Sequence, residues 1–464
     1  MGLPELDRSL VEEVEALKAE GRAKPPERVI AAYIPARGEK GPRYRLTGSD
    51  REFLRMNSNS YLSLSNHAAV IDAADAATRQ FGVGPGAVRF IDGTFSFHVA
   101  LEERIARFVG KPAAKIFNSA YTANCGFALT VSHKQTYWIG DQLNHNSIIR
   151  AMRIASVPAA NRGIYDHKDM EGLMRCLDAV PVEVERVVII FDGVFSMRGD
   201  CAPMDEIQKI AHTFDRRFKD GVMTAVDDSH GIGAFGETGR GTAEFTGAQP
   251  DVIIGTFGKA FGVNGGFIAG SQALVEAIRQ KADTYIYTNP LGVADCAAAI
   301  KAIELCDSLE GRQRLRDLQE SIRRFRQGIA SLGLESIPGP HPVVPVLVRD
   351  TAKTHLKSIF RKLEVHSRAE LAATWFKNVS TSGERIRRQA APPALVPRFI
   401  AAGVVIATLL TLSSSNGSPE LKVSAVKSVD SARSADAGIY PISPETGDCR
   451  LDWIKSGFLV SCPR

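Results

Sequence analysis

The chain has 464 residues, with 57 lysines and arginines against 52 aspartates and glutamates, and a net charge of +5. This length excludes a single small core and favours two domains with additional segments, and the mild charge gives no reason to expect a nucleic-acid partner. The cysteines form no CxxC pair, and the N-terminus lacks the pattern of a signal peptide. We therefore expect a cytoplasmic protein with reduced, buried cysteines at Cys125, Cys176, Cys201, Cys296 and Cys306.

The first segment, residues 1–51, predicts an amphipathic helix over 6–18 and then an arm rich in proline and arginine. From residue 52 to 306, short apolar runs alternate with stretches of helical spacing. Helical spacing is clearest at 101–109 and 205–214. The almost continuously apolar runs lie at 187–191, 223–226 and 252–254. Such runs are typical of strands that a sheet buries on both faces, so this region predicts an α/β domain.

A lysine follows one of these apolar strands. The run before it ends in Gly255 and Thr256, Lys259 stands three residues after the threonine, and glycines follow. A lysine that loses water favours its neutral, nucleophilic form, so Lys259 is a candidate Schiff-base former, and the Thr256 hydroxyl could bind a phosphate. By itself this pattern is weak, because a lysine after a glycine is more often a solvated turn residue.

The strand before that one ends in an acid. Asp227 closes the run at 223–226, and His230 follows three residues later. An aspartate in this place can pair with the protonated ring nitrogen of pyridoxal phosphate (PLP). The alternative is a pair of turn aspartates, but two strands that end in an acid and in a lysine favour a cofactor site.

Together these motifs resemble the α-oxoamine synthase family of fold-type I PLP-dependent enzymes, which join an amino acid to an acyl-CoA with loss of carbon dioxide. The motifs occur in family order at 59–62, 88–94, 98, 101–103, 117–124, 141–147, 192–197, 227–230, 239–241 and 255–259. The resemblance implies a large domain, 52–306, with a mainly parallel seven-stranded sheet, and a smaller α+β domain, 307–398. It also implies a homodimer in which the N-terminal arm wraps the partner subunit.

The resemblance implies roles around the cofactor ring. Lys259 would hold PLP as a Schiff base and then move protons as general acid and base. Asp227 would keep the pyridine nitrogen protonated, and His145 would stack on the ring. His230 and Ser196 would hydrogen-bond the ring oxygen.

Further roles concern the phosphate and the substrate. The backbone at Ala120 and Tyr121 would open a helix whose first amides bind the phosphate. Thr256 would add a hydroxyl, and Thr288 would reach the phosphate from the other subunit. Asn59 would lie near the substrate carboxylate. Two positions depart from the family pattern, an arginine within 197–199 and the alanine at 120.

The small domain is expected to begin with a charged helix, a turn at 333–339 and a strand at 343–348. In the family, the first arginine of an Arg-x-Arg strand holds the substrate carboxylate. Arg385 stands in that context and is the candidate ligand here.

The C-terminal part is atypical. Residues 354–373 resemble half of a LuxR-type helix-turn-helix, but an amphipathic helix with a solvated basic face is the favoured interpretation. The apolar run 399–412 has 14 residues, fewer than the about 20 that span a bilayer, which favours a core element or an interfacial segment. The polar segment 413–464 predicts a poorly ordered extension. A fusion or a frameshift after Asp350 would also explain this part of the sequence.

The sequence therefore predicts a PLP-dependent acyltransferase that condenses an amino acid with an acyl-CoA or acyl carrier protein thioester, with decarboxylation. Two alternatives stay open. Another fold-type I enzyme, an aminotransferase or an aldolase, would use Lys259 and Asp227 without an acyl thioester. A non-catalytic regulator would keep the PLP domain as a sensor and use residues 354–373 on DNA. No metal, membrane or nucleic-acid partner is expected.

Overall fold

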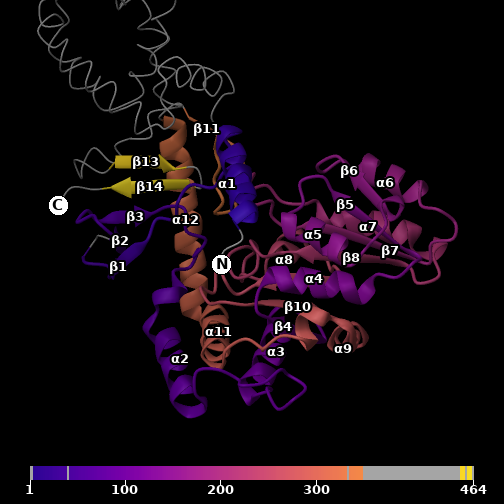
Figure 1. The fold of residues 1–464 in the computed structure, drawn as a ribbon, viewed down its shortest axis with the longest axis horizontal. Coiled ribbons are helices and arrows are strands. Elements are labelled where there is room, and N and C mark those ends of the chain that lie inside the picture. Colours follow the sequence, from indigo (N-terminus) through magenta and orange to yellow (C-terminus); the bar gives the residue numbers. More distant parts are fainter. Residues whose placement is uncertain (1–3, 39–40, 332–333, 348–449, 455–456, 462–464) are drawn as a thin grey trace, which may run out of the picture. The chain divides into compact units, whose positions relative to one another are not determined.

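The structure is a computed structural model that describes residues 4–38, 41–331, 334–347, 450–454 and 457–461. The chain divides into two units, one of residues 1–57 with 366–464 and one of residues 58–365, and Figure 1 labels described helices and strands of both. Several predictions lie outside the described residues: the segment 354–373, Arg385 and the apolar run 399–412.

A seven-stranded sheet is the centre of the unit 58–365, with the strand order β4-β10-β9-β8-β7-β5-β6. The pairings of β5 to β9 are parallel, and β10 is antiparallel to both its neighbours. All three predicted apolar runs are central strands of this sheet. The strands are β4 (Ala113–Phe117), β5 (Thr136–Asp141), β6 (Arg162–Tyr165), β7 (Arg186–Asp192), β8 (Val222–Asp227), β9 (Val252–Thr256) and β10 (Gly266–Gly270).

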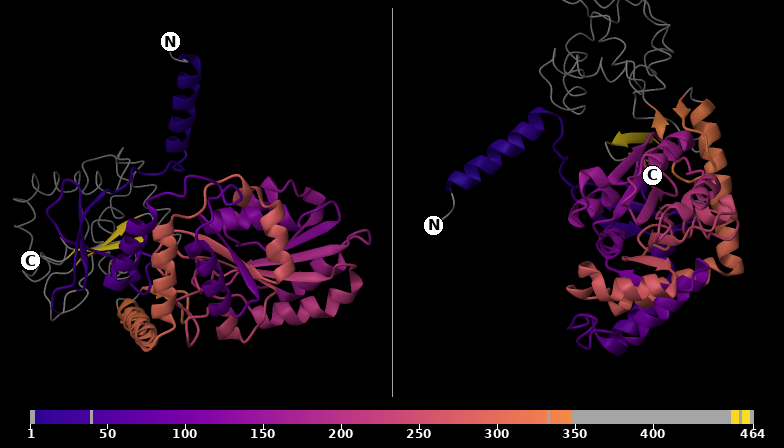
Figure 2. Two further views of the ribbon diagram at one scale, coloured as in Figure 1. Left: turned by 90° about the horizontal axis from the view of Figure 1, so that it is seen from below. Right: turned by 90° about the vertical axis from the view of Figure 1, so that its right-hand side faces the viewer.

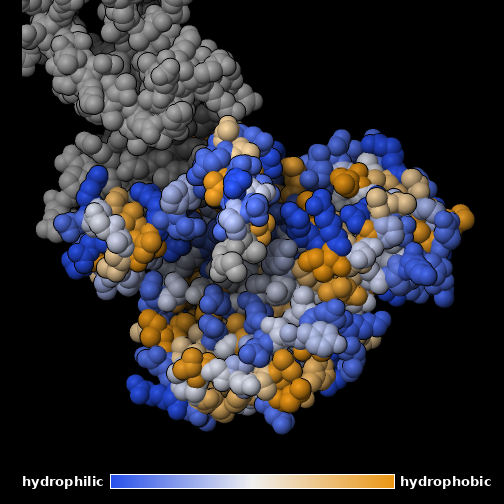
Figure 3. Space-filling model, viewed as in Figure 1, coloured by the Kyte–Doolittle hydropathy of each residue, from blue (hydrophilic) through white to orange (hydrophobic). Residues whose placement is uncertain are grey.

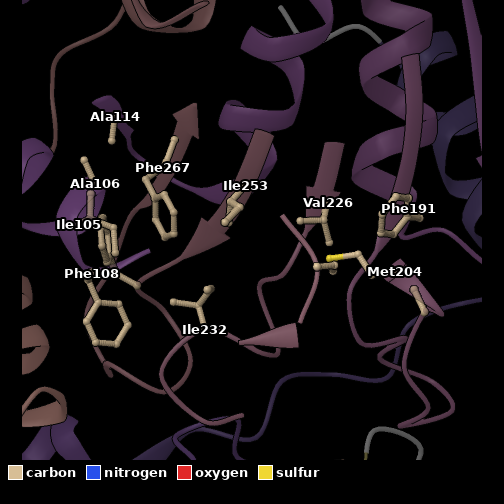
Figure 4. Close-up of a cluster of buried hydrophobic side chains, with 14 of the residues drawn as sticks. Ile105, Ala106, Phe108, Ala114, Phe191, Met204, Val226, Ile232, Ile253 and Phe267 are labelled. Atoms are coloured by element: carbon tan, nitrogen blue, oxygen red, sulfur yellow. The ribbon is translucent and has the colours of Figure 1, made fainter. Parts of the chain in front are cut away.

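Helices cover both faces of the sheet (Figure 2). Alternate strand residues belong to the two hydrophobic clusters on opposite faces. In β7, Ile189 and Phe191 belong to one hydrophobic cluster, whereas Val188 and Ile190 belong to the other. Figure 4 shows the first cluster, where Phe191 of β7 lies near Met204. The helices packed on that face are α2 (Ala68–Phe81), α3 (Ser96–Phe108), α6 (Met170–Asp178), α7 (Met204–Phe214) and α11 (Val293–Cys306). Those on the other face are α4 (Ala120–Val131), α5 (Asn146–Ile154), α9 (Gln272–Lys281) and α10 (Asp283–Ile286).

The same unit contains the short helix α8 (Thr242–Thr246), the long charged helix α12 (Leu309–Ser331) and the strand pair β11 (Glu335–Ser336) and β12 (Val346–Leu347). The helix α12 confirms the charged helix predicted for this region. The strand predicted at 343–348 begins later than expected, at Val346. Pro345 has no amide hydrogen to donate to a ladder, so pairing begins at the next residue. The five cysteines within the described ranges are free, and Cys176 and Cys201 are half-buried rather than buried as expected.

The other unit holds α1 (Pro4–Ala19), which confirms the predicted N-terminal helix, and a five-stranded sheet in the order β1-β2-β3-β14-β13. Its strands are β1 (Ile30–Ile34), β2 (Arg43–Leu46), β3 (Phe53–Arg55), β13 (Arg450–Ile454) and β14 (Gly457–Ser461). The prediction of a poorly ordered extension over 413–464 is therefore wrong for its last part. The apolar residues within 450–461 favour strands, and β14 pairs with β3. No helix in the described parts of the chain is long and apolar enough to cross a membrane.

Candidate active site

The carboxyl ends of the parallel strands define the candidate site. β5 ends at Asp141, β7 at Asp192 and β8 at Asp227, and the last two residues are directly paired in register. β9 ends beside them at Thr256. In open α/β sheets this edge is the usual place of a ligand crevice, because loops that diverge from neighbouring strands leave room there.

Lys259 lies in the tight loop between β9 and β10. The loop is closed by hydrogen bonds from the Val263 amide to the Phe257 carbonyl (2.9 Å) and from the Phe257 amide to the Gly265 carbonyl (3.0 Å). Burial lowers the pKa of Lys259 from its usual 10.5, and the nearby carboxylates, Asp227 first, oppose this shift. Within the described residues the amine makes no hydrogen bond and no ion pair. A desolvated, unpaired amine suits a nucleophile that forms a Schiff base.

Asp227 is 4% exposed and is held by two donors. Its Oδ2 accepts from Asn124 Nδ2 at 2.7 Å, and its Oδ1 accepts from the Ser229 amide at 3.1 Å. Asn124 also donates to Ser147 Oγ at 3.0 Å. No cation within the described ranges forms an ion pair with this carboxylate, so it fits a cationic group of a ligand, such as a protonated pyridine nitrogen.

His230 is held in one tautomer by Tyr61. The Tyr61 hydroxyl lies 2.7 Å from His230 Nδ1 and 3.3 Å from Asn59 Oδ1. Burial raises the pKa of Tyr61, so its hydroxyl stays protonated, and burial lowers the pKa of His230 well below 6.5, so its ring is neutral. The hydroxyl has one hydrogen, and we assign it to the shorter of its two contacts, the one with His230 Nδ1. Nδ1 then accepts and Nε2 carries the hydrogen. Nε2 has no hydrogen-bond partner in the described parts of the chain, which leaves an N–H donor for a ligand oxygen.

His145 caps α5 and presents an exposed ring at the same edge. Its Nδ1 accepts from the Ser147 amide (3.2 Å), and its own amide donates to Asp192 Oδ2 (2.6 Å). Asp192 is buried, and burial raises the pKa of its carboxyl well above 3.8, with the charge of Asp227 acting in the same direction. The backbone of His145 is thus fixed, while its ring face stays open to a flat ligand.

The start of α4 provides the anion-binding end of the site. Ser119 caps the helix, with its Oγ accepting from the Thr122 amide at 3.1 Å. The first amides of the helix, at Ala120 and Tyr121, have no acceptor within the helix and can bind a phosphate. Gly266 packs directly against this helix start, where an added Cβ would overlap the backbone of Ser119 and Ala120.

Three further residues predicted to bind the cofactor, Thr256, Thr288 and Ser196, have different surroundings in the structure. The Thr256 hydroxyl donates to the Gly265 carbonyl at 2.9 Å, so it would have to change partner to donate to a phosphate. Thr288 lies beside Asn118 of its own chain, with Asn118 Nδ2 3.4 Å from Thr288 Oγ1. Ser196 is half-buried in the turn after β7, and it makes no hydrogen bond to another site residue in the described part of the chain.

The residues present fit PLP. Four features match the groups of that cofactor. Among the described residues, the half-buried amine of Lys259 is unpaired and suits the aldehyde, and the buried carboxylate of Asp227 has no cation and suits the ring nitrogen. The Nε2–H of His230 suits the ring oxygen, and the start of α4 suits the phosphate. Sequence reasoning gave no role to Asn124, Tyr61 or Asp192. All three fall inside family motifs, but the partners of Asn124 and Tyr61 lie 103 and 169 residues away, so only the fold reveals these contacts.

Fold and site together define a fold-type I PLP-dependent enzyme. The family model "Aminotransferase class I and II" matches residues 51–377, and the chain belongs to this family. A putative 8-amino-7-oxononanoate synthase of Bacillus licheniformis is 39% identical over 64% of this chain and 75% of its own length. The 8-amino-7-oxononanoate synthase of Geotalea daltonii is 36% identical over 74% and 83%.

Solved structures agree with this assignment. The serine palmitoyltransferase of Sphingomonas wittichii superposes with a TM-score of 0.65 at 28% identity, covering 77% of this chain and 86% of its own. A serine palmitoyltransferase variant from S. paucimobilis, with a bound PLP–myriocin aldimine, gives 0.63 at 27% identity over 73% and 81%. The chain therefore belongs to the α-oxoamine synthase branch, and the predicted family, fold class and PLP cofactor are confirmed.

Proposed function

We propose that the protein condenses an amino acid with an acyl thioester and releases carbon dioxide. The observation that carries the proposal is the grouping of Lys259, Asp227 and the Nε2–H of His230 at one edge of the sheet in a member of this branch. A new bond joins the amino-acid Cα to the acyl carbon. The C–S bond and the bond from Cα to the carboxylate break, and the thiolate takes up a proton to leave as thiol.

PLP, when bound, supplies an electron sink for negative charge at Cα. The chain's own residues orient it and move protons. Lys259 would hold the cofactor and would then take the Cα proton and return it, since burial lowers the pKa of its amine. Asp227 pairs with the ring nitrogen, and His230 donates to the ring oxygen with Ser196 beside it. His145 covers one face of the ring.

The remaining predicted residues bind the ends of cofactor and substrate. The amides of Ala120 and Tyr121 hold the phosphate, with the Thr256 hydroxyl next to them. Asn59, linked to Tyr61, lies near the substrate carboxylate, and Arg385 is the proposed bidentate carboxylate ligand.

Release of free thiol tests the reaction. The enzyme with PLP, mixed with a panel of amino acids and acyl thioesters, should liberate thiol only when both substrates are present. Lys259→Ala should abolish thiol release and should no longer retain PLP after borohydride reduction. The control Lys301→Ala, at an exposed lysine of α11, should release thiol and retain PLP like the wild type. Consumption of the amino acid without thiol release would instead support an aminotransferase or an aldolase, and covalent PLP in Lys259→Ala would refute the site.

We further propose a homodimer. Along one face of α1 four apolar side chains are exposed, and the loop after α2 exposes Val83, Phe90 and Ile91 at 83%, 43% and 70%. Figure 3 shows apolar surface gathered over α2 and α3. Such surface is typical of a protein interface. The four apolar residues on that face of α1 are Leu6, Leu10, Val14 and Leu17.

Sedimentation tests the dimer, and Thr288 tests whether sites are shared. If Thr288 acts across the interface, a mixed dimer of Thr288→Ala and Lys259→Ala subunits should regain one intact site of two. A monomer that binds PLP and releases thiol would contradict both statements.

A further inference from the structure

A histidine with no part in the proposed chemistry is tied to the site. His341 lies between β11 and β12 and is fully buried, with 0% exposure. Its Nδ1 accepts a hydrogen bond from the Val343 amide (3.0 Å), and its Nε2 lies 2.8 Å from the carbonyl oxygen of His230. An amide can only donate and a carbonyl can only accept, so the hydrogen of the neutral ring is on Nε2.

The ring of His341 stays neutral. Burial lowers its pKa to about 4, and the charges of Lys259 and Arg326 act in the same direction, while the hydrogen bond to His230 opposes them. Since both ring nitrogens are bonded to backbone groups, neither is left to reach a substrate. His341 is therefore not a catalytic residue, and it can influence the reaction only through the residues that it contacts, of which His230 is the one with a proposed role at the cofactor.

The ring also packs against the pair that defines the tautomer of His230. Its centroid lies 5.6 Å from that of Tyr61, 6.2 Å from that of His230 and 5.4 Å from that of Phe235, each in an edge-on arrangement. His230 is thus held from two sides. Tyr61 fixes its ring nitrogen, and His341 fixes its carbonyl from a segment 111 residues away.

We propose that His341 is a positioning residue that holds the backbone of His230, so that the Nε2–H of His230 points at the cofactor's ring oxygen. The proposal rests on the proposed role of His230. The turn before His230 also carries Asp227. The hydrogen bond from His341 therefore also fixes the spacing between Asp227, the proposed partner of the ring nitrogen, and His230, the proposed donor to the ring oxygen. Without it, the turn can shift by fractions of an ångström, enough to misalign a hydrogen bond.

The chain offers a matched control. His98 is also fully buried, its Nδ1 accepts from the Phe95 amide at 2.9 Å, and its Nε2 donates to the Leu291 carbonyl at 2.7 Å. The bonding pattern is the same as that of His341, but the carbonyl belongs to Leu291, which has no proposed role in cofactor binding. Equal substitutions at the two histidines separate a structural role from a positioning role.

The test compares His341→Phe and His341→Gln with His98→Phe and His98→Gln. Phenylalanine keeps the ring and removes both hydrogen bonds, whereas glutamine keeps an N–H donor. Each protein is measured without cofactor by ring-¹⁵N NMR of His230, and then for its dissociation constant for PLP. We expect His341→Phe to shift the His230 ring signals and to weaken PLP binding about tenfold or more, the scale of losing a supporting hydrogen bond behind a ligand-binding residue.

The other variants complete the expected pattern. His341→Gln should recover most of the PLP affinity, and both His98 variants should lose stability while His230 signals and PLP affinity stay unchanged. Unaltered His230 signals and PLP affinity in the His341 variants would overturn the proposal. If neither His341 variant folds, the wild-type spectrum decides: a His341 ring protonated on Nδ1 would also overturn it. If neither the wild type nor any variant binds PLP, the proposed function is refuted. The NMR comparison without cofactor would still test whether the hydrogen bond from His341 positions His230.

Discussion

Replacing Lys259 by methionine should stabilise the cofactor-free protein at neutral pH. Burial lowers the pKa of the Lys259 amine from its usual 10.5, so folding takes a protonated lysine into a place that disfavours its charge. Asp227, Asp192 and Asp228 offset part of that cost. For a group whose folded pKa is depressed below its unfolded pKa, the cost is full below the folded pKa and disappears as pH rises towards 10.5. Methionine has a similar length and no charge to desolvate.

The expected gain in unfolding free energy is about 0.5–2 kcal/mol at pH 7, the range of substitutions that relieve a strained functional residue. Urea unfolding of the PLP-free proteins at several pH values between 7 and 10 measures it, and the gain should shrink across this interval. Lys209→Met, at a lysine of α7 whose side chain is 76% exposed, should change stability by no more than about 0.5 kcal/mol. A loss of stability in Lys259→Met at pH 7, or a gain that does not depend on pH, would refute the reasoning.

Three further predictions follow from contacts around the site. Gly266→Ala should lower the unfolding free energy by about 1–3 kcal/mol and weaken PLP binding, because the added Cβ overlaps the backbone at the start of α4. The control Gly84→Ala adds a Cβ that meets nothing within 4 Å, so urea unfolding and PLP titration should both be unchanged. Arg89→Met should cost about 1–3 kcal/mol in urea unfolding, since the buried Glu102 loses its 3.0 Å partner and keeps only the ion pair with Lys115 at 2.6 Å. The double change with Glu102→Met should recover part of that loss. Arg385→Ala should keep the cofactor's visible absorbance and weaken amino-acid binding by about 1.5–3 kcal/mol in a spectroscopic titration; equal binding by both proteins would remove Arg385 from the site.

The sequence was sufficient to predict the strand ends and the residues placed directly on them. Asp227 and Lys259 follow apolar runs that the structure confirms as β8 and β9, and local patterning determines such features. Contacts between distant segments were not predictable in this way. No local pattern pairs Asn124 with Asp227, or β14 with β3, because those partners meet only once the chain has folded.

The hydrogen-bonding state of a side chain was equally out of reach. The sequence predicted that His230 would face the ring oxygen, but which nitrogen carries its hydrogen depends on the Tyr61 hydroxyl at 2.7 Å and on burial. The same holds for Thr256, whose hydroxyl was expected at the phosphate and is bonded to the Gly265 carbonyl. Residue type suggests what a group can do, and its neighbours decide what it does.

The charges along the site explain why one small cofactor satisfies so many separate features. At the strand ends, burial raises the pKa of Asp228 to about 7 and that of Asp192 well above 3.8, so the charged forms of these carboxyls are disfavoured there unless a cation approaches. At α4 the unpaired amides and the helix dipole create a positive potential. PLP carries a protonated ring nitrogen at one end and a phosphate at the other. A ligand with this charge separation relieves both ends at once, and its orientation in the site follows from electrostatics before any specific contact is considered.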